Sequence, residues 1–205
     1  MINELKNILS NRLKAPLPGI QAHLEVAPYR KVDYTPEQLK NAKQSGVLIL
    51  FYEKLDGIYA VMIERAINNG KHSGQIAFPG GKKEVDDANL IETALRETEE
   101  EVGVIKNHIE IIGSLSDVYI PVSNYRVLPS VGVISYQPSF ILQEEEVKSV
   151  LEVNINEIIH PQALSSEKIT LSNGTKILAP CFNLNNQIVW GATALMVNEL
   201  RHLLK

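Results

Sequence analysis

Apolar and polar positions along this 205-residue chain follow two periods, one typical of strands and one typical of helices. The continuous apolar run Val47–Tyr52 predicts a buried strand. The segment Ile58–Arg65 predicts a second strand, and Asp56-Gly57 between them is a hairpin signal. The same pattern predicts three more strands, at Ile109–Tyr119, Val127–Tyr136 and Thr175–Leu184.

Two segments carry helical spacing. After Asp86 and Asp87, either of which could be the N-cap, one narrow apolar face is formed by Ile91, Leu95, Thr98 and Val102. Gly103 then fits a left-handed C-cap. The segment Ala192–Leu204 predicts a terminal helix. Strands mixed with a few helices predict an α/β sandwich.

The first of these helices carries a dense group of carboxylates. Glu97, Glu100 and Glu101 share one face at spacings i, i+3 and i+4, where like charges repel. Mg²⁺ takes hard oxygen ligands, so these three glutamates and the Gly81 carbonyl predict a site for Mg²⁺ or Mn²⁺. Arg96 is spaced to reach Glu100 or to brace a carboxylate from the glycine turn. The alternative is a solvated acidic helix face.

The segment from Gly81 to Val104 resembles the Nudix box. That family pattern is Gly, five residues, Glu, seven residues, then Arg-Glu, apolar, any, Glu-Glu, any, Gly, apolar. The second half matches from Arg96, with Thr98 at an apolar position. In the first half Asp87 replaces Glu, and eight residues separate it from Arg96. An Asp and a one-residue insertion resemble one Nudix branch, the coenzyme A pyrophosphatases.

The segment preceding the box resembles the second motif of that branch, which runs Arg, Ser or Ala, three residues, Arg, three residues, Gly, three residues, Phe-Pro-Gly-Gly. The matching positions are Arg65, Ala66, Gly74, Phe78, Pro79, Gly80 and Gly81. Gly70 stands where the branch has its second Arg, and the adjacent Lys71 lacks the bidentate fork of Arg. The resemblance implies substrate contacts from Arg65, Lys71 and His72. A backbone-bonded loop histidine is the alternative for His72.

Two loops after the box add further candidates. Glu145-Glu146-Val147 resembles the acidic segment that follows the box in this branch, and Glu146 is the expected general base, with Glu144 and Glu145 as competitors. The polar, aromatic loop that ends at Arg126 could line a nucleotide site, with Arg126 on a phosphate. A plain hairpin connection is the alternative for that loop.

The resemblance implies a Nudix-type α/β/α sandwich with a mixed sheet and a metal-dependent pyrophosphohydrolase. The expected substrate is coenzyme A or a derivative, with products 3′-phospho-AMP and 4′-phosphopantetheine. The expected catalytic residues are Arg96, Glu97, Glu100, Glu101 and Glu146. Hydrolysis of another dinucleotide, such as ADP-ribose or NADH, is the alternative that Gly70 leaves open. A non-catalytic nucleotide-sensing module is a further alternative, which the intact Arg-Glu…Glu-Glu set disfavours.

Composition sets the remaining expectations. The length predicts one domain with a short leader, and the 44% hydrophobic content predicts a full core. The Pro, Lys and Gln content around Tyr34–Ser45 places the boundary near residue 40, which gives a leader at residues 1–40 and one domain at residues 41–205. A net charge of −4 disfavours nucleic-acid binding, and no apolar run has the length of a membrane span. The single Cys181, read as a buried thiol, and an N-terminus unlike a signal peptide predict a cytoplasmic protein. The expected partner is a small nucleotide similar to coenzyme A, with a homodimer as one option.

Overall fold

The computed structural model describes residues 1–67, 72–170 and 174–205. Its helices, together with a short 3₁₀ turn at Lys106–His108, are α1 (Ile2–Arg12), α2 (Gly19–Val26), α3 (Pro36–Lys40), α4 (Leu90–Val102), α5 (Ile155–Ile159) and α6 (Gly191–Leu204). Its strands are β1 (Lys43–Lys54), β2 (Gly57–Arg65), β3 (Ile76–Ala77), β4 (Gly80–Lys82), β5 (Glu110–Ser114), β6 (Val118–Ile120), β7 (Tyr125–Val133), β8 (Val147–Asn154), β9 (Leu164–Thr170), β10 (Lys176–Leu184) and β11 (Gln187–Trp190).

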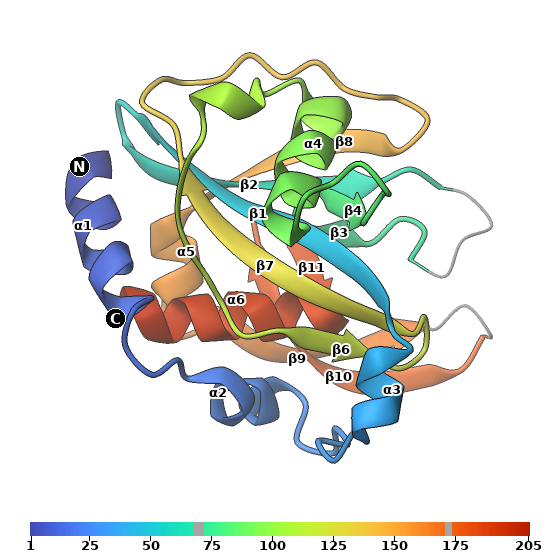
Figure 1. Cartoon of the computed structure of the whole chain (residues 1–205). Helices are drawn as coiled ribbons and strands as arrows, with labels where there is room; N and C mark the ends of the chain where they lie inside the picture. Colours follow the sequence, from blue (N-terminus) through green and yellow to red (C-terminus); the bar gives the residue numbers. More distant parts are fainter. Residues whose placement is uncertain (68–71, 171–173) are drawn as a thin grey trace.

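The main sheet is mixed and is built around β1. Its central order is β3-β2-β1-β7-β5, with β4 also on β1, β6 on β7 and β8 on β2. The β1–β7 pair is parallel, whereas β1 and β2 form the predicted antiparallel hairpin. A second sheet has the order β11-β10-β9. In Figure 1, α4 lies on one side of the main sheet and α6 on the other. The predicted α/β sandwich is therefore confirmed.

Alternation along β1 supplies both faces of the sheet. Leu48, Leu50 and Tyr52 are buried in the hydrophobic cluster that holds the apolar face of α4. Ile49 and Phe51 are buried in the cluster on the other face, where the α6 contribution is Ala194, Leu195, Met196, Val197, Leu200 and Leu203. Because strand side chains alternate in direction, one central strand anchors both layers.

Several predicted boundaries are wrong. The N-cap of α4 is Asn89, whose side chain accepts from Ile91 N and Glu92 N, and not Asp86 or Asp87. The strand predicted at Ile109–Tyr119 is divided into β5 and β6, with a register shift before Gly113. The predicted left-handed C-cap at Gly103 is confirmed, with φ +74°.

The N-terminal helices share the core of the rest of the chain. Leu5, Leu9 and Val26, from α1 and α2, belong to the same buried cluster as Phe51 and Leu200. Residues 1–40 therefore contribute to the packing behind the main sheet. Within the described residues, no helix is long and apolar enough to cross a membrane.

Candidate active site

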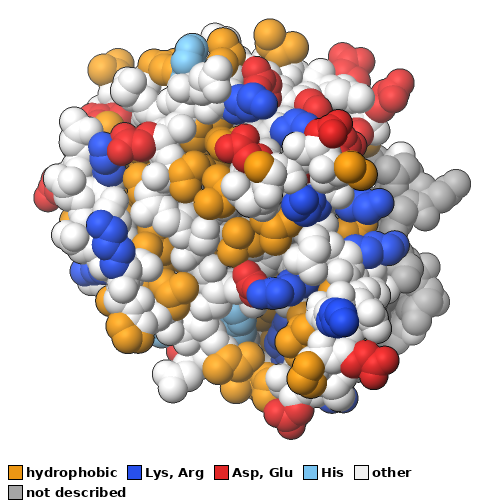
Figure 2. Space-filling model, in the orientation of Figure 1, with side chains coloured by type: hydrophobic (Ala, Val, Ile, Leu, Met, Phe, Trp, Pro, Cys, Tyr) orange, Lys and Arg blue, Asp and Glu red, His pale blue; other side chains and the backbone are white. Residues whose placement is uncertain are grey.

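Three carboxylates meet where α4 faces the loop before β8. Glu97 and Glu101 come from α4, Glu146 comes from the loop, and one oxygen of each lies within 4.8 Å of the other two. The adjoining cavity is lined by Glu97, Glu100, Glu101, Gln143 and Glu146. On the face in Figure 2, acidic and basic side chains gather together over α4 and the loops beside it. The structure thus brings together carboxylates that are distant in the sequence.

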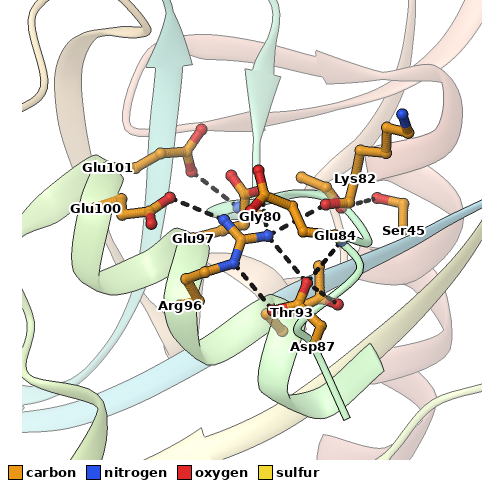
Figure 3. Close-up of polar contacts among 12 residues, drawn as sticks. Ser45, Gly80, Lys82, Glu84, Asp87, Thr93, Arg96, Glu97, Glu100 and Glu101 are labelled. Carbon is orange, nitrogen blue, oxygen red and sulfur yellow. Dashed lines mark hydrogen bonds and ion pairs between the residues drawn. The ribbon is translucent and has the colours of Figure 1, made fainter. Parts of the chain in front are cut away.

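The glycine turn lets the backbone approach these carboxylates closely. Gly80 N donates to Glu101 Oε2 at 2.8 Å (Figure 3). A Cβ at Gly81 would overlap the Glu97 carboxylate, and a Cβ at Gly80 would lie 2.5 Å from Val47 Cα. Ser45 Oγ donates to the Gly81 carbonyl at 2.6 Å. A side chain at Gly80 would collide with backbone atoms of β1, so glycine is required there, whereas a side chain at Gly81 would displace the Glu97 carboxylate.

Arg96 braces the site, and Asp87 is its main partner. Arg96 Nε donates to Asp87 Oδ1 at 3.0 Å, and Nη2 donates to Asp87 Oδ2 at 3.0 Å. The same guanidinium contacts Glu97 Oε1 at 3.0 Å and Glu100 Oε2 at 2.9 Å (Figure 3). Hydrogen bonds from Arg96 hold the pKa of Asp87 well below its usual range, despite its burial. Thr93 Oγ1 also donates to Asp87 at 2.9 Å.

Glu101 is buried, with 2% of its surface exposed. This burial raises the pKa of Glu101 to about 7, and the charges of Glu97 and Glu146 act in the same direction. The Gly80 N–H and Arg65 oppose the shift. Among the described residues, Oε1 of Glu101 has no hydrogen-bond partner, and Arg65 Nη1 lies 3.7 Å from it. A buried carboxylate atom is thus left facing other carboxylates.

This donor set fits a divalent metal ion. Carboxylate oxygens are hard ligands of the kind that Mg²⁺ and Mn²⁺ prefer. A cation would coordinate the Glu101 oxygen that accepts no hydrogen bond among the described residues, and it would offset the repulsion between the three carboxylates. Glu100, expected in the metal group, lies on the same cavity wall but is half exposed and paired with Arg96. The group of three mutually close carboxylates contains Glu146, from the loop before β8, which helix spacing could not reveal.

Of the other residues predicted to contact the substrate, Arg65 lies at the carboxylate cluster and Arg126 does not line the cavity. Arg65 lies beside Glu101, at a register shift between β2 and β8 that follows Glu64. His72 Nδ1 lies 3.1 Å from Gln75 Oε1, and Lys71 is outside the described residues. Arg126 pairs with Asp117 through Nε at 2.6 Å and is not among the residues lining the cavity. Gln143 lines the cavity and was not singled out from the sequence.

A sequence model of the NUDIX domain matches residues 42–173. This chain belongs to the Nudix hydrolases. It is 35% identical over 140 residues to a protein of Yersinia pestis (strain Pestoides F) named "Uncharacterized Nudix hydrolase NudL", covering 68% of this chain and 69% of that one. The protein of the same name from Yersinia pseudotuberculosis (strain YPIII) matches equally. The protein is therefore a Nudix pyrophosphohydrolase, of a family that generally uses divalent metal ions.

Solved Nudix structures share the fold. RenU of M. smegmatis aligns with a TM-score of 0.56 at 11% identity, covering 80% of this chain and 86% of that one. The NUDIX domain of Shewanella oneidensis NrtR, solved with ADP ribose, aligns with a TM-score of 0.52 at 18% identity, covering 84% and 95%. At these identities the likeness concerns the fold alone. It agrees with the mixed sheet flanked by helices.

Proposed function

We propose that this Nudix hydrolase cleaves the pyrophosphate bond of coenzyme A or its derivatives, giving 3′-phospho-AMP and 4′-phosphopantetheine. The observation that carries the proposal is the position of the coenzyme A-like motif. Its first residue, Arg65, lies 3.7 Å from Glu101. Its second, Ala66, donates its N–H to Glu146 O at 2.8 Å. Its last glycines lie against Glu101 and Glu97. Both ends of the motif therefore border the carboxylate cluster.

The metal-holding residues in this proposal are Glu97, Glu101 and the Gly81 carbonyl, with Glu100 at the rim and Glu146 completing the cluster. When bound, a divalent metal ion supplies Lewis-acid polarisation and charge neutralisation at the phosphoryl oxygens. Arg96, held by Asp87, keeps Glu97 and Glu100 on the cavity wall. The set positions the substrate and offsets the charge that develops during hydrolysis.

Glu146 is the proposed proton acceptor. Hydrolysis forms a bond between a water oxygen and one phosphorus, breaks the bridging P–O bond and releases a proton from the water. The Glu146 carboxylate is exposed and belongs to the cluster, so it can take that proton and release it to solvent. Glu144 and Glu145 are not among the residues lining the cavity. This difference favours Glu146 over its two neighbours.

Arg65 is the best-placed substrate contact. Its guanidinium is partly exposed beside Glu101, where it can form charge-assisted hydrogen bonds to a phosphate. His72 and its neighbour in the sequence, Lys71, are proposed to support it. Arg126, which pairs with Asp117 and is about half exposed, is proposed as a further phosphate contact. A cytoplasmic location and a homodimer stay predictions.

The alternative substrate is another nucleoside diphosphate derivative, such as ADP-ribose or NADH. It is favoured by Gly70, which removes the second Arg of the coenzyme A-like motif. The NrtR domain of similar fold was solved with ADP ribose. Both alternatives use the same carboxylate cluster and differ only in what the surrounding residues recognise.

A product screen tests the proposal. Purified protein with Mg²⁺ is given equal concentrations of coenzyme A, dephospho-coenzyme A, ADP-ribose and NADH, and the products are identified by mass. Coenzyme A should be turned over fastest. Faster turnover of ADP-ribose would overturn the coenzyme A assignment and leave the general activity in place.

Substitution of Arg65 tests the observation that carries the proposal. Arg65→Ala should raise KM for coenzyme A about tenfold or more, the size of one charge-assisted contact, with little change in Tm. Arg65→Lys keeps the positive charge without the bidentate guanidinium, so its KM should lie between those of wild type and Arg65→Ala. An unchanged KM for Arg65→Ala would remove Arg65 from the binding site.

A further inference from the structure

Gln143 occupies a special place on the cavity wall. The residues lining the cavity in the described part of the chain are four glutamates and this one amide. Its backbone N–H donates to Glu101 O at 3.1 Å, and Ile141 N donates to Val102 O at 3.0 Å. These bonds use carbonyls at the end of α4 that have no partner within the helix. The loop is thus attached to α4 at the same residue that supplies a carboxylate to the cluster.

Gln143 also organises the turn that leads to Glu146. Its carbonyl accepts from Glu146 N at 3.0 Å and from Val147 N at 2.8 Å. Its side-chain Oε1 accepts from Glu145 N at 2.8 Å. The side-chain bond from residue i to the N–H of residue i+2 resembles the Asx turn, with one more methylene. Within this turn, the N–H groups of residues 145, 146 and 147 all donate to Gln143.

We propose that Gln143 is a positioning residue, whose side-chain cap on Glu145 N holds the turn that presents Glu146 to the cluster. The proposal rests on the proposed function of Glu146. The other end of the turn is fixed by Ala66, which donates to Glu146 O. Glu146 itself is exposed and has no side-chain hydrogen bond among the described residues. Its location therefore depends on the backbone that carries it.

The inference separates Gln143 from the exposed glutamates beside it. Glu144 and Glu145 share the turn, but their side chains form no hydrogen bond within it in the part of the chain that the structure describes, and neither lines the cavity. A substitution at Glu144 changes charge near the site without touching the cap. Loss of the cap, in contrast, removes no carboxylate group from the site but widens the range of positions that the Glu146 side chain can occupy.

Two variants test the cap. Gln143→Met has the same length but only a weakly accepting sulfur in place of the amide oxygen, whereas Gln143→Asn keeps an amide acceptor that reaches the i+2 N–H. In metal-free protein, amide exchange at Glu145 should be about fivefold faster in Gln143→Met than in wild type, the factor that one neutral hydrogen bond is worth. Gln143→Asn should restore slow exchange. Equal exchange in all three proteins would overturn the cap.

Kinetics test the positioning role. Gln143→Met should lower kcat about fivefold with KM unchanged, Gln143→Asn should recover most of the loss, and Glu144→Gln should behave as wild type. In a Glu146→Gln background, Gln143→Met should have no further effect, because both changes act through one carboxylate. Additive losses would assign Gln143 a role independent of Glu146. No turnover by wild type with any substrate would refute the proposed function, whereas wild-type turnover unaffected by Gln143→Met would refute the positioning role alone.

Discussion

Asp87 connects the glycine turn to α4 through the Arg96 guanidinium. It is 7% exposed and accepts two hydrogen bonds from Arg96, one from Thr93 Oγ1 and one from Glu84 N. All four donors favour a charged acceptor. The same guanidinium contacts Glu97 and Glu100, so Asp87 sets the position of two cavity carboxylates without lining the cavity.

Asp87→Asn should therefore affect both stability and turnover. An amide would present an N–H to at least one existing donor, and the loss of a charged hydrogen bond costs about 2 kcal/mol. We expect a Tm lower by several degrees and kcat reduced about tenfold. Thermal unfolding and steady-state kinetics measure the two effects. Asp86→Asn, an exposed neighbour, is the matched control and should change neither. Equal behaviour of the two variants would contradict the role of Asp87.

Glu101→Gln should abolish turnover and stabilise the metal-free protein. At pH 8 the buried Glu101 carboxylate faces Glu97 and Glu146, and replacing it with an amide removes that repulsion while keeping an acceptor for Gly80 N. We expect a gain of roughly 1 kcal/mol, or about 3 °C in Tm. A gain in stability together with a loss of activity is expected when a residue of an active site is retained for function at the expense of stability.

Two measurements check that prediction. Glu99→Gln removes the same charge from α4 at a residue outside the cavity lining, and should leave both Tm and turnover near wild type. Millimolar Mg²⁺ or Mn²⁺ should raise the Tm of wild type by mass action and leave that of Glu97→Gln/Glu101→Gln unchanged. A tenfold loss of activity corresponds to an increase of about 1.4 kcal/mol in the activation free energy. If Glu101→Gln keeps more than about a tenth of wild-type activity, Glu101 is not a metal ligand.

The part of the site that lies on one helix was predictable from the sequence. Glu97 and Glu101 are one turn apart, so their shared face follows from helical spacing alone. Glu146 and Gln143 join them through a loop whose course depends on backbone bonds to α4 and to Ala66. No periodicity describes such a loop. Helical spacing did predict the contact between Arg96 and Glu100, which are four residues apart and form an ion pair at 2.9 Å.

At the scale of elements, the site depends on close packing of α4 against β1. Gly46 lies opposite Gly81 in the β1–β4 pair and faces the first turns of α4. A Cβ at Gly46 would overlap the Leu90 carbonyl oxygen and lie 3.0 Å from Ala94 N. Those neighbours are backbone atoms, which cannot move independently of the helix. The distance between the helix and the strand is therefore limited by this glycine.

Gly46→Ala should displace α4 from the glycine turn. Overpacking of this kind costs about 1–3 kcal/mol. We expect a lower Tm and a loss of activity greater than stability alone explains, because Glu97 and Glu101 move with α4 relative to Gly81. Gly174→Ala is the control, since its Cβ meets nothing within 4 Å and only the positive φ of +81° adds a cost of about 1 kcal/mol. Full activity in a folded Gly46→Ala would contradict the model of close packing.

Elements with strong local patterns were predicted, and those without them were not. The β1–β2 hairpin and α4 have a clear apolar period together with Gly57 and Gly103 at their ends. Helix α3 is only five residues long and has no buried residue, so its local signals are limited to the capping box and the proline in its first turn. Strand β9 is mostly exposed and forms through pairing with β10. Pairing and tertiary packing, which no local window contains, decide such elements.

At the scale of the whole molecule, Glu199 joins the two ends of the chain. It is fully buried on α6 and accepts hydrogen bonds from Gly19 N at 3.2 Å and from Ser116 Oγ at 2.7 Å. His23 Nε2, from α2, lies 3.0 Å from its other oxygen. The family match covers residues 42–173, so α2 and α6 both lie outside it, whereas Ser116, in the loop after β5, lies inside it. The Glu199 carboxylate therefore links two flanking helices to the family domain. These flanking helices are thus held to the domain by one carboxylate as well as by the shared core.

The pH dependence of stability should report this link. Burial alone would raise the pKa of Glu199, but hydrogen bonds from His23 and Ser116 outweigh it and place the pKa below its usual value. A lowered folded-state pKa gives a contribution to stability that is complete above the unfolded-state value, about 4.3, and is lost as the pH falls through the folded-state value. Acid should therefore weaken the attachment of α2.

Glu199→Gln tests this directly. Its amide would point at least one N–H toward groups that now donate, at a cost of about 3 kcal/mol for breaking a buried charged network. We expect Glu199→Gln to have a lower Tm than wild type at pH 7 and faster amide exchange in α2. The difference in the free energy of unfolding between the two proteins should narrow below about pH 4, as Glu199 of the wild type becomes protonated in both the folded and the unfolded state. Urea unfolding from pH 3 to 8 measures the narrowing. Glu4→Gln, an exposed carboxylate of the same N-terminal segment, should show no such effect. A difference between Glu199→Gln and wild type that stayed constant down to pH 3 would show that the carboxylate charge is not what holds the two ends together.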